Sequence, residues 1–366
     1  MVERTLELGL DTFGDVTFGP DGPPLGMPQV LRNVVAEGVL ADQVGLDFFG
    51  VGEHHREDFA VSAPDVVLAA IAGQTTTIRL GSAVTVLSSD DPVRVFQRFS
   101  TLDAVSDGRA EVILGRGSFT ESFPLFGFRL DQYERLFEEK LALFAALLEE
   151  GPVTWSGETR AALEGQRVFP PTESGSLRTW IGVGGNPNSV VRAAHYGLPL
   201  MIAIIGGHPL AFEPLVDLFH RALTHAGRPT QPVAVHAPGY VADTDEQARE
   251  EMWPPYAAMQ QRIGRERGWA PMSRHQFERA ADPDGALFVG SPGTVAAKVA
   301  GVVEGLGLSR FDLKYSIGTL SHEQLMRSID LYGREVAPLV RTAIGATADP
   351  SPATPADPFP EGAPAV

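Results

Sequence analysis

The feature that most constrains the fold of this chain is an alternation of short β-rich runs with longer helical patterns. Along the 366 residues we expect eight strands, at 6–13, 47–52, 79–87, 110–114, 177–183, 200–205, 233–242 and 311–317. A helix is expected after each strand, at 28–44, 64–75, 92–105, 131–149, 188–196, 212–226, 245–267 and 322–340. Eight such units close a parallel barrel, whereas a doubly wound sheet more often has about five to seven strands. The sequence therefore predicts an α/β fold, a (β/α)8 TIM barrel.

Two segments interrupt this rhythm, at 152–171 and at 269–290, and an extra helix is expected at 292–305. We interpret both segments as insertions that lengthen loops over the mouth at the carboxyl ends of the strands. Residues 1–345 are expected to form a single barrel domain. Residues 346–366 are rich in Pro and Ala and poor in large apolar groups, so we expect a disordered tail. Asp91 and Ser321 are the expected N-caps of two of the helices.

Composition excludes several classes of partner. The chain has 46 acidic and 29 basic residues, a net charge of −17, which disfavours nucleic acid and anionic membranes. No signal peptide opens the sequence and no apolar stretch is long enough to span a bilayer. The absence of cysteine removes disulfides and thiolate ligands and fits a cytoplasmic location.

The stretch "GVGEHHREDF" ends the second predicted strand with Glu53, His54 and His55. These residues could form a metal site, a proton-handling site or the polar lip of a buried strand. Neighbouring side chains on a strand point to opposite faces, so the two histidines cannot easily hold one ion together. We do not expect a metal. A structural role for one histidine and a cavity-facing acid–base role for the other are the remaining readings.

Two glycine-rich stretches predict an anion site. "LGRGSF" places Arg116 between glycines after the fourth strand, where a guanidinium can bind phosphate or form a salt bridge at the strand end. "GVGGNPNSVV" ends the fifth strand and opens a helix whose free N–H groups, with Asn186 and Ser189, would bind an anion. Its glycine spacing does not match a dinucleotide fingerprint, and a turn without a ligand is the alternative.

Together, these stretches resemble the bacterial-luciferase-like family of flavin-dependent monooxygenases, and the resemblance runs from Leu6 to about Val340. The matching pieces include "GLDFFGVGEHHREDF", "RLGSAVTVLSSDDPVRVFQ", "EVILGRGS", "WIGVGGNPNSVVRAAHYGLP" and "FVGSPGTVAAKV". The family's fold is a (β/α)8 barrel, in agreement with the strand count.

The resemblance implies roles for individual residues. His54 would be the catalytic acid/base and Glu53 would lie near the flavin ring. Ala83 and Val84 would form the backbone under the ring, where family members often have a non-proline cis peptide. A phosphate would be held by Arg116, Gly185, Asn186 and Ser189, and Ser118 would contact the flavin through its backbone. Luciferase has a glutamate and a serine in place of Gly185 and Asn186, and a cysteine in place of Gly115, so light emission is not implied.

The implied reaction is the insertion of oxygen from O2 into a small organic substrate through a flavin hydroperoxide. FMN would be the cofactor, with FMNH2 supplied by a separate NAD(P)H-dependent flavin reductase, and the protein would be a homodimer. One alternative is an F420-dependent hydride-transfer oxidoreductase, which would favour more basic residues at the mouth. A non-catalytic flavin-binding protein and a metal-dependent barrel hydrolase are two others.

Overall fold

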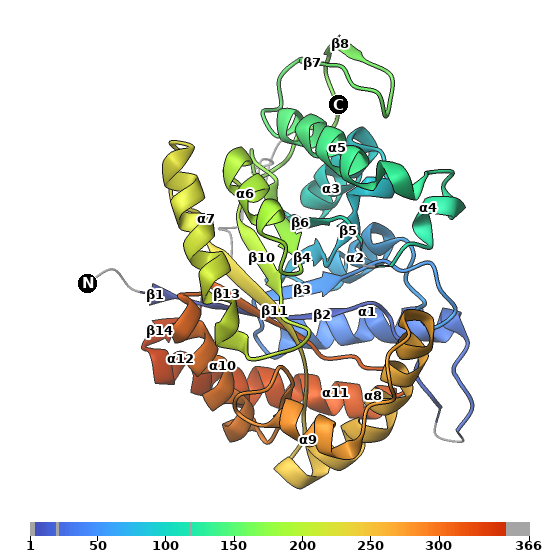
Figure 1. Cartoon of the computed structure of the whole chain (residues 1–366), viewed down its shortest axis with the longest axis vertical. Helices are drawn as coiled ribbons and strands as arrows, with labels where there is room; N and C mark the ends of the chain where they lie inside the picture. Colours follow the sequence, from blue (N-terminus) through green and yellow to red (C-terminus); the bar gives the residue numbers. More distant parts are fainter. Residues whose placement is uncertain (1–3, 20–21, 118, 349–366) are drawn as a thin grey trace, which may run out of the picture.

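The computed structural model describes residues 4–19, 22–117 and 119–348. Its centre is a closed barrel of eight parallel strands (Figure 1), as predicted. In order around the barrel these are β2 (Glu7–Thr12), β3 (Phe48–Val51), β4 (Arg79–Ser82), β6 (Ala110–Gly115), β9 (Arg178–Val183), β10 (Leu200–Ala203), β11 (Val233–Val241) and β13 (Arg310–Lys314). Pairing of β10 with β11 and of β13 with β2 closes the circle.

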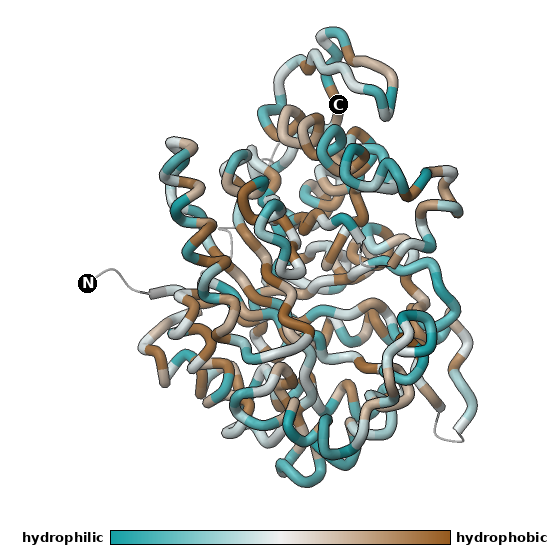
Figure 2. The backbone as a smooth tube through the Cα atoms, in the orientation of Figure 1, coloured by the Kyte–Doolittle hydropathy of each residue, from teal (hydrophilic) through white to brown (hydrophobic). Residues whose placement is uncertain are grey.

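Helices surround the barrel. They are α1 (Met27–Gln43), α2 (Pro64–Ala72), α3 (Pro92–Val105), α5 (Tyr133–Leu147), α6 (Pro187–Tyr196), α7 (Glu213–His225), α10 (Pro292–Leu306), α11 (His322–Leu331) and α12 (Ala337–Ile344). Apolar segments concentrate in the strands and on the helix faces that cover them (Figure 2). The predicted N-caps are confirmed: Asp91 accepts the N–H groups of Val93 and Arg94, and Ser321 forms a capping box with Gln324.

The barrel interior is filled in layers. Near the amino ends of the strands, the buried Arg310 pairs with Glu7 and Glu111. Above this ion cluster lies an apolar layer formed by Phe48, Ala83, Ile113, Trp180, Met201 and Ala234. These two layers fill the lumen of the barrel below the carboxyl ends of the strands.

Three details differ from the sequence-based expectations. The expected third strand is broken after Ser82 and resumes as β5 (Thr85–Val86) and a short 3-10 helix, Leu87–Ser89. The segment expected to be irregular contains α9 (Arg274–Ala281), with its own capping box, and β12 (Phe288–Gly290). The helix expected to be extra, α10, contacts α7 on one side and α12 on the other, so it completes the outer ring.

The long helix α8 (Asp245–Arg267), expected to belong to the ring, instead packs with α9 and β12. Its C-terminal end lies on the side of the molecule where the loops after the strands gather, at the right in Figure 1. The other insertion forms the hairpin β7 (Val153–Trp155) and β8 (Leu163–Gln166), and a short helix α4 (Ser122–Leu125) follows β6.

The chain ends also differ from the expectation. Ala346 and Thr347 form β14, which pairs in parallel with β1 (Arg4–Thr5), so the predicted tail begins too early. The rest of that tail, residues 349–366, lies outside the described residues. No helix in the described ranges is both long and apolar enough to cross a membrane.

Candidate active site

His54 lies in the loop after β3, inside a cage of aromatic rings. Its ring centroid is 4.7 Å from that of Phe13, 4.6 Å from Phe59 and 4.9 Å from Phe119. Nδ1 lies 3.5 Å from the Glu121 carboxylate, and 11% of the side chain is exposed. Three rings and one carboxylate thus hold the imidazole in place and leave Nε2 as its other polar atom.

The contact with His54 affects the pKa of the Glu121 carboxyl. Burial raises its pKa, but hydrogen bonds from the His54 ring and from backbone N–H groups outweigh burial and leave the pKa below its usual value. A carboxylate beside Nδ1 favours the tautomer in which Nδ1 carries the proton. Nε2 is then free to accept one.

Glu53 and His55 form a separate pair. One Glu53 carboxylate oxygen accepts the N–H of Val86 at 2.6 Å, and the other lies 3.2 Å from Nε2 of His55. The hydrogen bond to Glu53 raises the pKa of His55 against the opposing effect of burial. The His55 ring packs on Phe126, with 5.0 Å between the ring centroids. His54 and His55 therefore have different neighbours.

The break in the third strand lies between Ala83 and Val84, whose peptide bond is cis, as the resemblance implied. Glycines let neighbouring backbone approach it. A Cβ on Gly52 would lie 2.4 Å from the Ala83 carbonyl oxygen, and one on Gly115 would lie 2.5 Å from Val84 Cγ2. Any side chain larger than hydrogen at Gly115 would therefore displace Val84.

Arg116, directly after β6, is ion-paired with Glu134 on α5 and lies over the Tyr133 ring. Glu134 also lies 3.3 Å from Arg192 on α6, which pairs with Glu138 at 2.8 Å as well. The salt-bridge alternative for Arg116 is thus realised in this structure. Because Glu134 joins Arg116 to Arg192, a carboxylate occupies the position between two arginines.

The amino end of α6 carries the other residues expected to hold an anion. The Asn186 side chain caps the helix by accepting the Asn188 N–H at 2.9 Å. Ser189 Oγ is buried and has no hydrogen-bond partner in the described part of the chain. Gly185 has φ +103°, and a Cβ there would meet nothing within 4 Å, so the turn is open. A buried hydroxyl without a partner at the amino end of a helix fits an anion. The backbone N–H groups of Asn188, Ser189 and Val190 already donate to Asn186. Ser118 lies outside the described residues.

Other polar groups of the mouth were not among the expected site residues. Lys314 is buried and donates to Asp15 at 2.7 Å, and Nδ1 of His236 lies 2.5 Å from Asp11. Lys314 lies on β13, whose sequence "RFDLK" alternates charged and apolar residues, which is the pattern of an inward-facing barrel position. That pattern could have identified Lys314, whereas β11, "VAVHAPGYV", has no such alternation at His236.

No group of three or more His, Asp or Glu residues able to hold an ion occurs among residues 4–19, 22–117 and 119–348. The fold and this site together define a (β/α)8 barrel protein whose strand ends carry a caged imidazole and, at the amino end of α6, an open turn with a buried unpartnered hydroxyl.

The family model described as luciferase-like monooxygenase matches residues 12–310, and the chain belongs to that family. A 4-hydroxyprotoasukamycin monooxygenase from Streptomyces nodosus subsp. asukaensis is 25% identical, over 81% of this chain and 83% of the relative. An alkanal monooxygenase alpha chain from Photorhabdus laumondii is 26% identical, but the match spans only 53% of this chain and 54% of that one.

Two solved structures show the same fold. The oxygenating constituent of 3,6-diketocamphane monooxygenase from Pseudomonas putida, in complex with FMN, has a TM-score of 0.73 at 20% identity and covers 92% of this chain and 98% of its own. The coenzyme F420-dependent tetrahydromethanopterin reductase from Methanopyrus kandleri has a TM-score of 0.69 at 19% identity and covers 92% and 99%.

Proposed function

We propose that the protein is an FMNH2-dependent monooxygenase that inserts oxygen from O2 into a small organic substrate. FMNH2 would come from a separate NAD(P)H-dependent flavin reductase. The observation that carries the proposal is the unpartnered Ser189 Oγ at the amino end of α6, at the same end of the barrel as the caged His54. A phosphate-tailed cofactor held there would lie at the same end of the barrel as the imidazole.

The residues present fit FMN. Its phosphate would be held by Ser189 and, once the phosphate replaces Glu134, by Arg116. Glu53, Ala83 and Val84 would lie beside the ring. When bound and reduced, the flavin supplies the electrons that activate O2.

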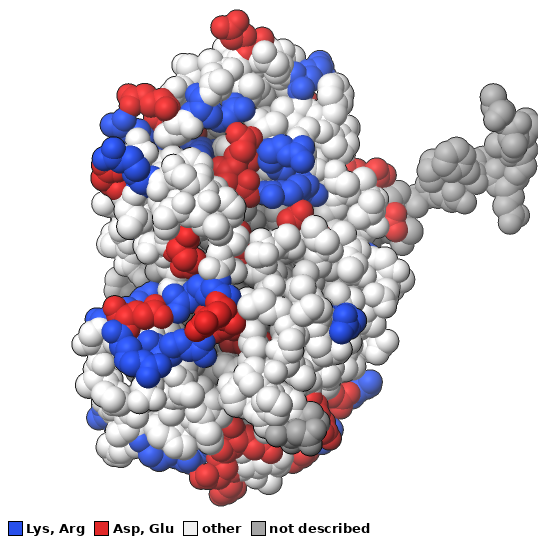
Figure 3. All heavy atoms as spheres, turned by 90° about the vertical axis from the view of Figure 1, so that its right-hand side faces the viewer, with Lys and Arg blue, Asp and Glu red and all other residues white. Residues whose placement is uncertain are grey.

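The chain's own contribution is shielding and proton transfer. Phe13, Phe59 and Phe119 keep water from the imidazole. Arg56, in the loop after β3, makes a bidentate pair with Glu266 at the end of α8 and so ties that helix over the loop. Acidic and basic side chains alternate over this face (Figure 3). His54, held by Glu121 through Nδ1, would exchange the proton at Nε2.

Hydride transfer with F420 is the alternative, supported by the F420-dependent neighbour. The longer anionic tail of F420 favours unpaired cations at the mouth. Arg56 is paired with Asp58 and Glu266, and Arg262 with Asp58, which favours FMN. A flavin-binding protein without catalysis would keep the expected phosphate-binding residues, Arg116 and Ser189, but would not need the caged imidazole of His54.

Cofactor titration tests the proposal. We expect the full chain to bind FMN, followed by the shift of the flavin absorbance bands, at least tenfold more tightly than F420. With FMNH2 generated by an added flavin reductase and NADH, O2 consumption above that of free FMNH2 is expected. Tight binding of F420 without binding of FMN would reject the FMN assignment.

We also propose a homodimer formed through α2 and α3. Val66 on α2 is 65% exposed and Val105 on the adjoining α3 is 58% exposed, so each of these two contacting helices presents a large apolar side chain to solvent. Val66→Asp is expected to convert the dimer to monomer in light scattering. Val191→Asp, on α6, should leave the mass unchanged. A wild-type chain that stays monomeric at every concentration would refute the proposal.

A further inference from the structure

A second imidazole faces the mouth of the barrel. His236 lies on β11, two residues after the inward-facing Ala234, and its Nδ1 is 2.5 Å from an Asp11 carboxylate oxygen on β2. Asp11 is 1% exposed, whereas 15% of the His236 side chain is exposed. The carboxylate is therefore sealed inside the barrel, while the ring that it holds reaches the open space above.

A buried acid lies beside this pair. Asp312 on β13 is in register with His236, and neither of its carboxyl oxygens has a hydrogen-bond partner in the described residues. Burial, and then the nearby Asp11, raise the pKa of Asp312 well above its ordinary value against the opposing effect of Arg310. Burial thus favours the neutral form of Asp312. Asp11 is the acceptor for the Nδ1–H of His236.

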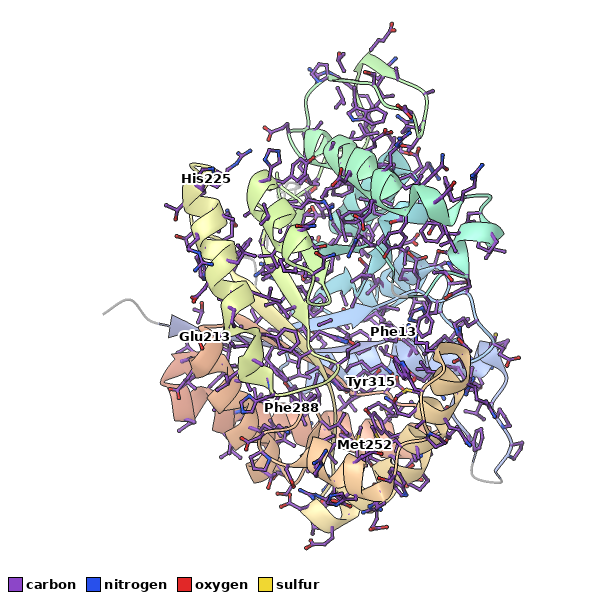
Figure 4. The ribbon with its side chains drawn as sticks, viewed as in Figure 1. Phe13, Glu213, His225, Met252, Phe288 and Tyr315 are labelled. Carbon is purple, nitrogen blue, oxygen red and sulfur yellow. The ribbon has the colours of Figure 1, made fainter. Side chains whose placement is uncertain are left out.

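The contact between Asp11 and His236 determines which hydrogen bond the outer ring nitrogen of His236 can form. With the proton on Nδ1 directed at Asp11, the neutral ring presents Nε2 as an acceptor. The Phe13 ring contacts both imidazoles: its centroid is 6.3 Å from that of His236 and 4.7 Å from that of His54 (Phe13 is labelled in Figure 4). Phe13 is therefore an aromatic surface that adjoins both histidines.

We propose that His236, positioned by Asp11, binds a hydroxyl group of the organic substrate. The inference rests on the proposed function and specifies its substrate class: an alcohol or phenol whose apolar body packs on Phe13 while its O–H donates to Nε2. A hydroxyl-binding site rejects an analogue without the hydroxyl because the imidazole nitrogen is then buried without a partner.

Phenol and toluene are matched probes because they have similar size and differ in the hydroxyl. The FMN-loaded full chain, labelled with ¹⁵N-histidine, is titrated with each, and the His236 signals are assigned from the spectrum of His236→Gln. Phenol is expected to shift the Nε2 signal of His236, toluene is not, and phenol should bind about tenfold more tightly.

Substitutions distinguish a role of His236 in binding the hydroxyl from a purely structural role. His236→Phe should lose the tenfold preference for phenol, while His225→Phe, at the far end of α7 from Phe13 in Figure 4, should retain it. Asp11→Asn should move His236 toward the tautomer protonated at Nε2, a spectral change that a purely structural role would not produce. Thermal melting checks that each variant folds.

The inference is overturned if phenol up to its solubility limit leaves the His236 signals in place, or if toluene shifts them equally. It is likewise overturned if wild type and His236→Phe show the same ratio of phenol to toluene affinity. The absorbance of bound FMN is read in the same samples. A chain that fails to bind FMN contradicts the proposed function, whereas bound FMN with an unresponsive His236 contradicts only the hydroxyl site.

Discussion

His54→Ala is expected to bind FMN within about threefold of wild type yet to release hydrogen peroxide about 100-fold faster when its FMNH2 complex meets O2, the low end of what a positioned acid–base group contributes. The reason is that the imidazole fills the cage of Phe13, Phe59 and Phe119 and, in the proposed function, handles a proton, so its loss would also admit water to the site. Rapid mixing with a peroxide-coupled dye measures the rate.

Two comparisons sharpen this result. His54→Gln keeps much of the volume but cannot take up a proton, so a fast peroxide release here too assigns the effect to proton transfer rather than shielding. His208→Ala removes a half-exposed histidine that caps the 3-10 helix Pro209–Phe212 and should change nothing. A peroxide rate in His54→Ala equal to that of wild type would remove His54 from the mechanism.

Arg116→Ala is expected to weaken FMN binding about 10- to 100-fold and riboflavin binding less than about threefold. A charge-assisted hydrogen bond contributes about 1.5–3 kcal/mol, and about 1.4 kcal/mol corresponds to a factor of ten. Only FMN carries the phosphate, so only FMN loses this contact. Isothermal titration of the two flavins gives both affinities.

Because Arg116 is ion-paired with Glu134, a substitution of Glu134 should change FMN binding in the opposite direction from Arg116→Ala. Because Glu134 would compete with the phosphate for Arg116, Glu134→Gln is expected to tighten FMN binding several-fold and leave riboflavin unchanged. Glu138→Gln is the matched control, since Glu138 pairs with Arg192 rather than with Arg116, and it should leave FMN binding unchanged. Equal weakening of FMN and riboflavin by Arg116→Ala would instead mean that the arginine is structural.

Some of the differences between the expected and the observed structure have a cause that is visible in the sequence. The capping box of Ser273 and Gln276 was visible in "SRHQ" and marks the start of α9, which was expected to be irregular. The positions of α8 and α10 had no such signal, because both have helical patterns and only packing against α7 and α12 decides which joins the outer ring. Local periodicity identifies a helix without saying where it packs.

The sequence by itself determined the barrel, since eight apolar strands alternating with amphipathic helices can bury their faces together in few other ways. It also determined that Glu53, His54 and Arg116 lie at the mouth, because each directly follows a strand. Only the tertiary structure decided their partners. Arg116 meets Glu134 and His236 meets Asp11 because closing the barrel brings together side chains that are 18 and 225 positions apart. Such contacts depend on strand register and helix packing, which local sequence patterns do not encode.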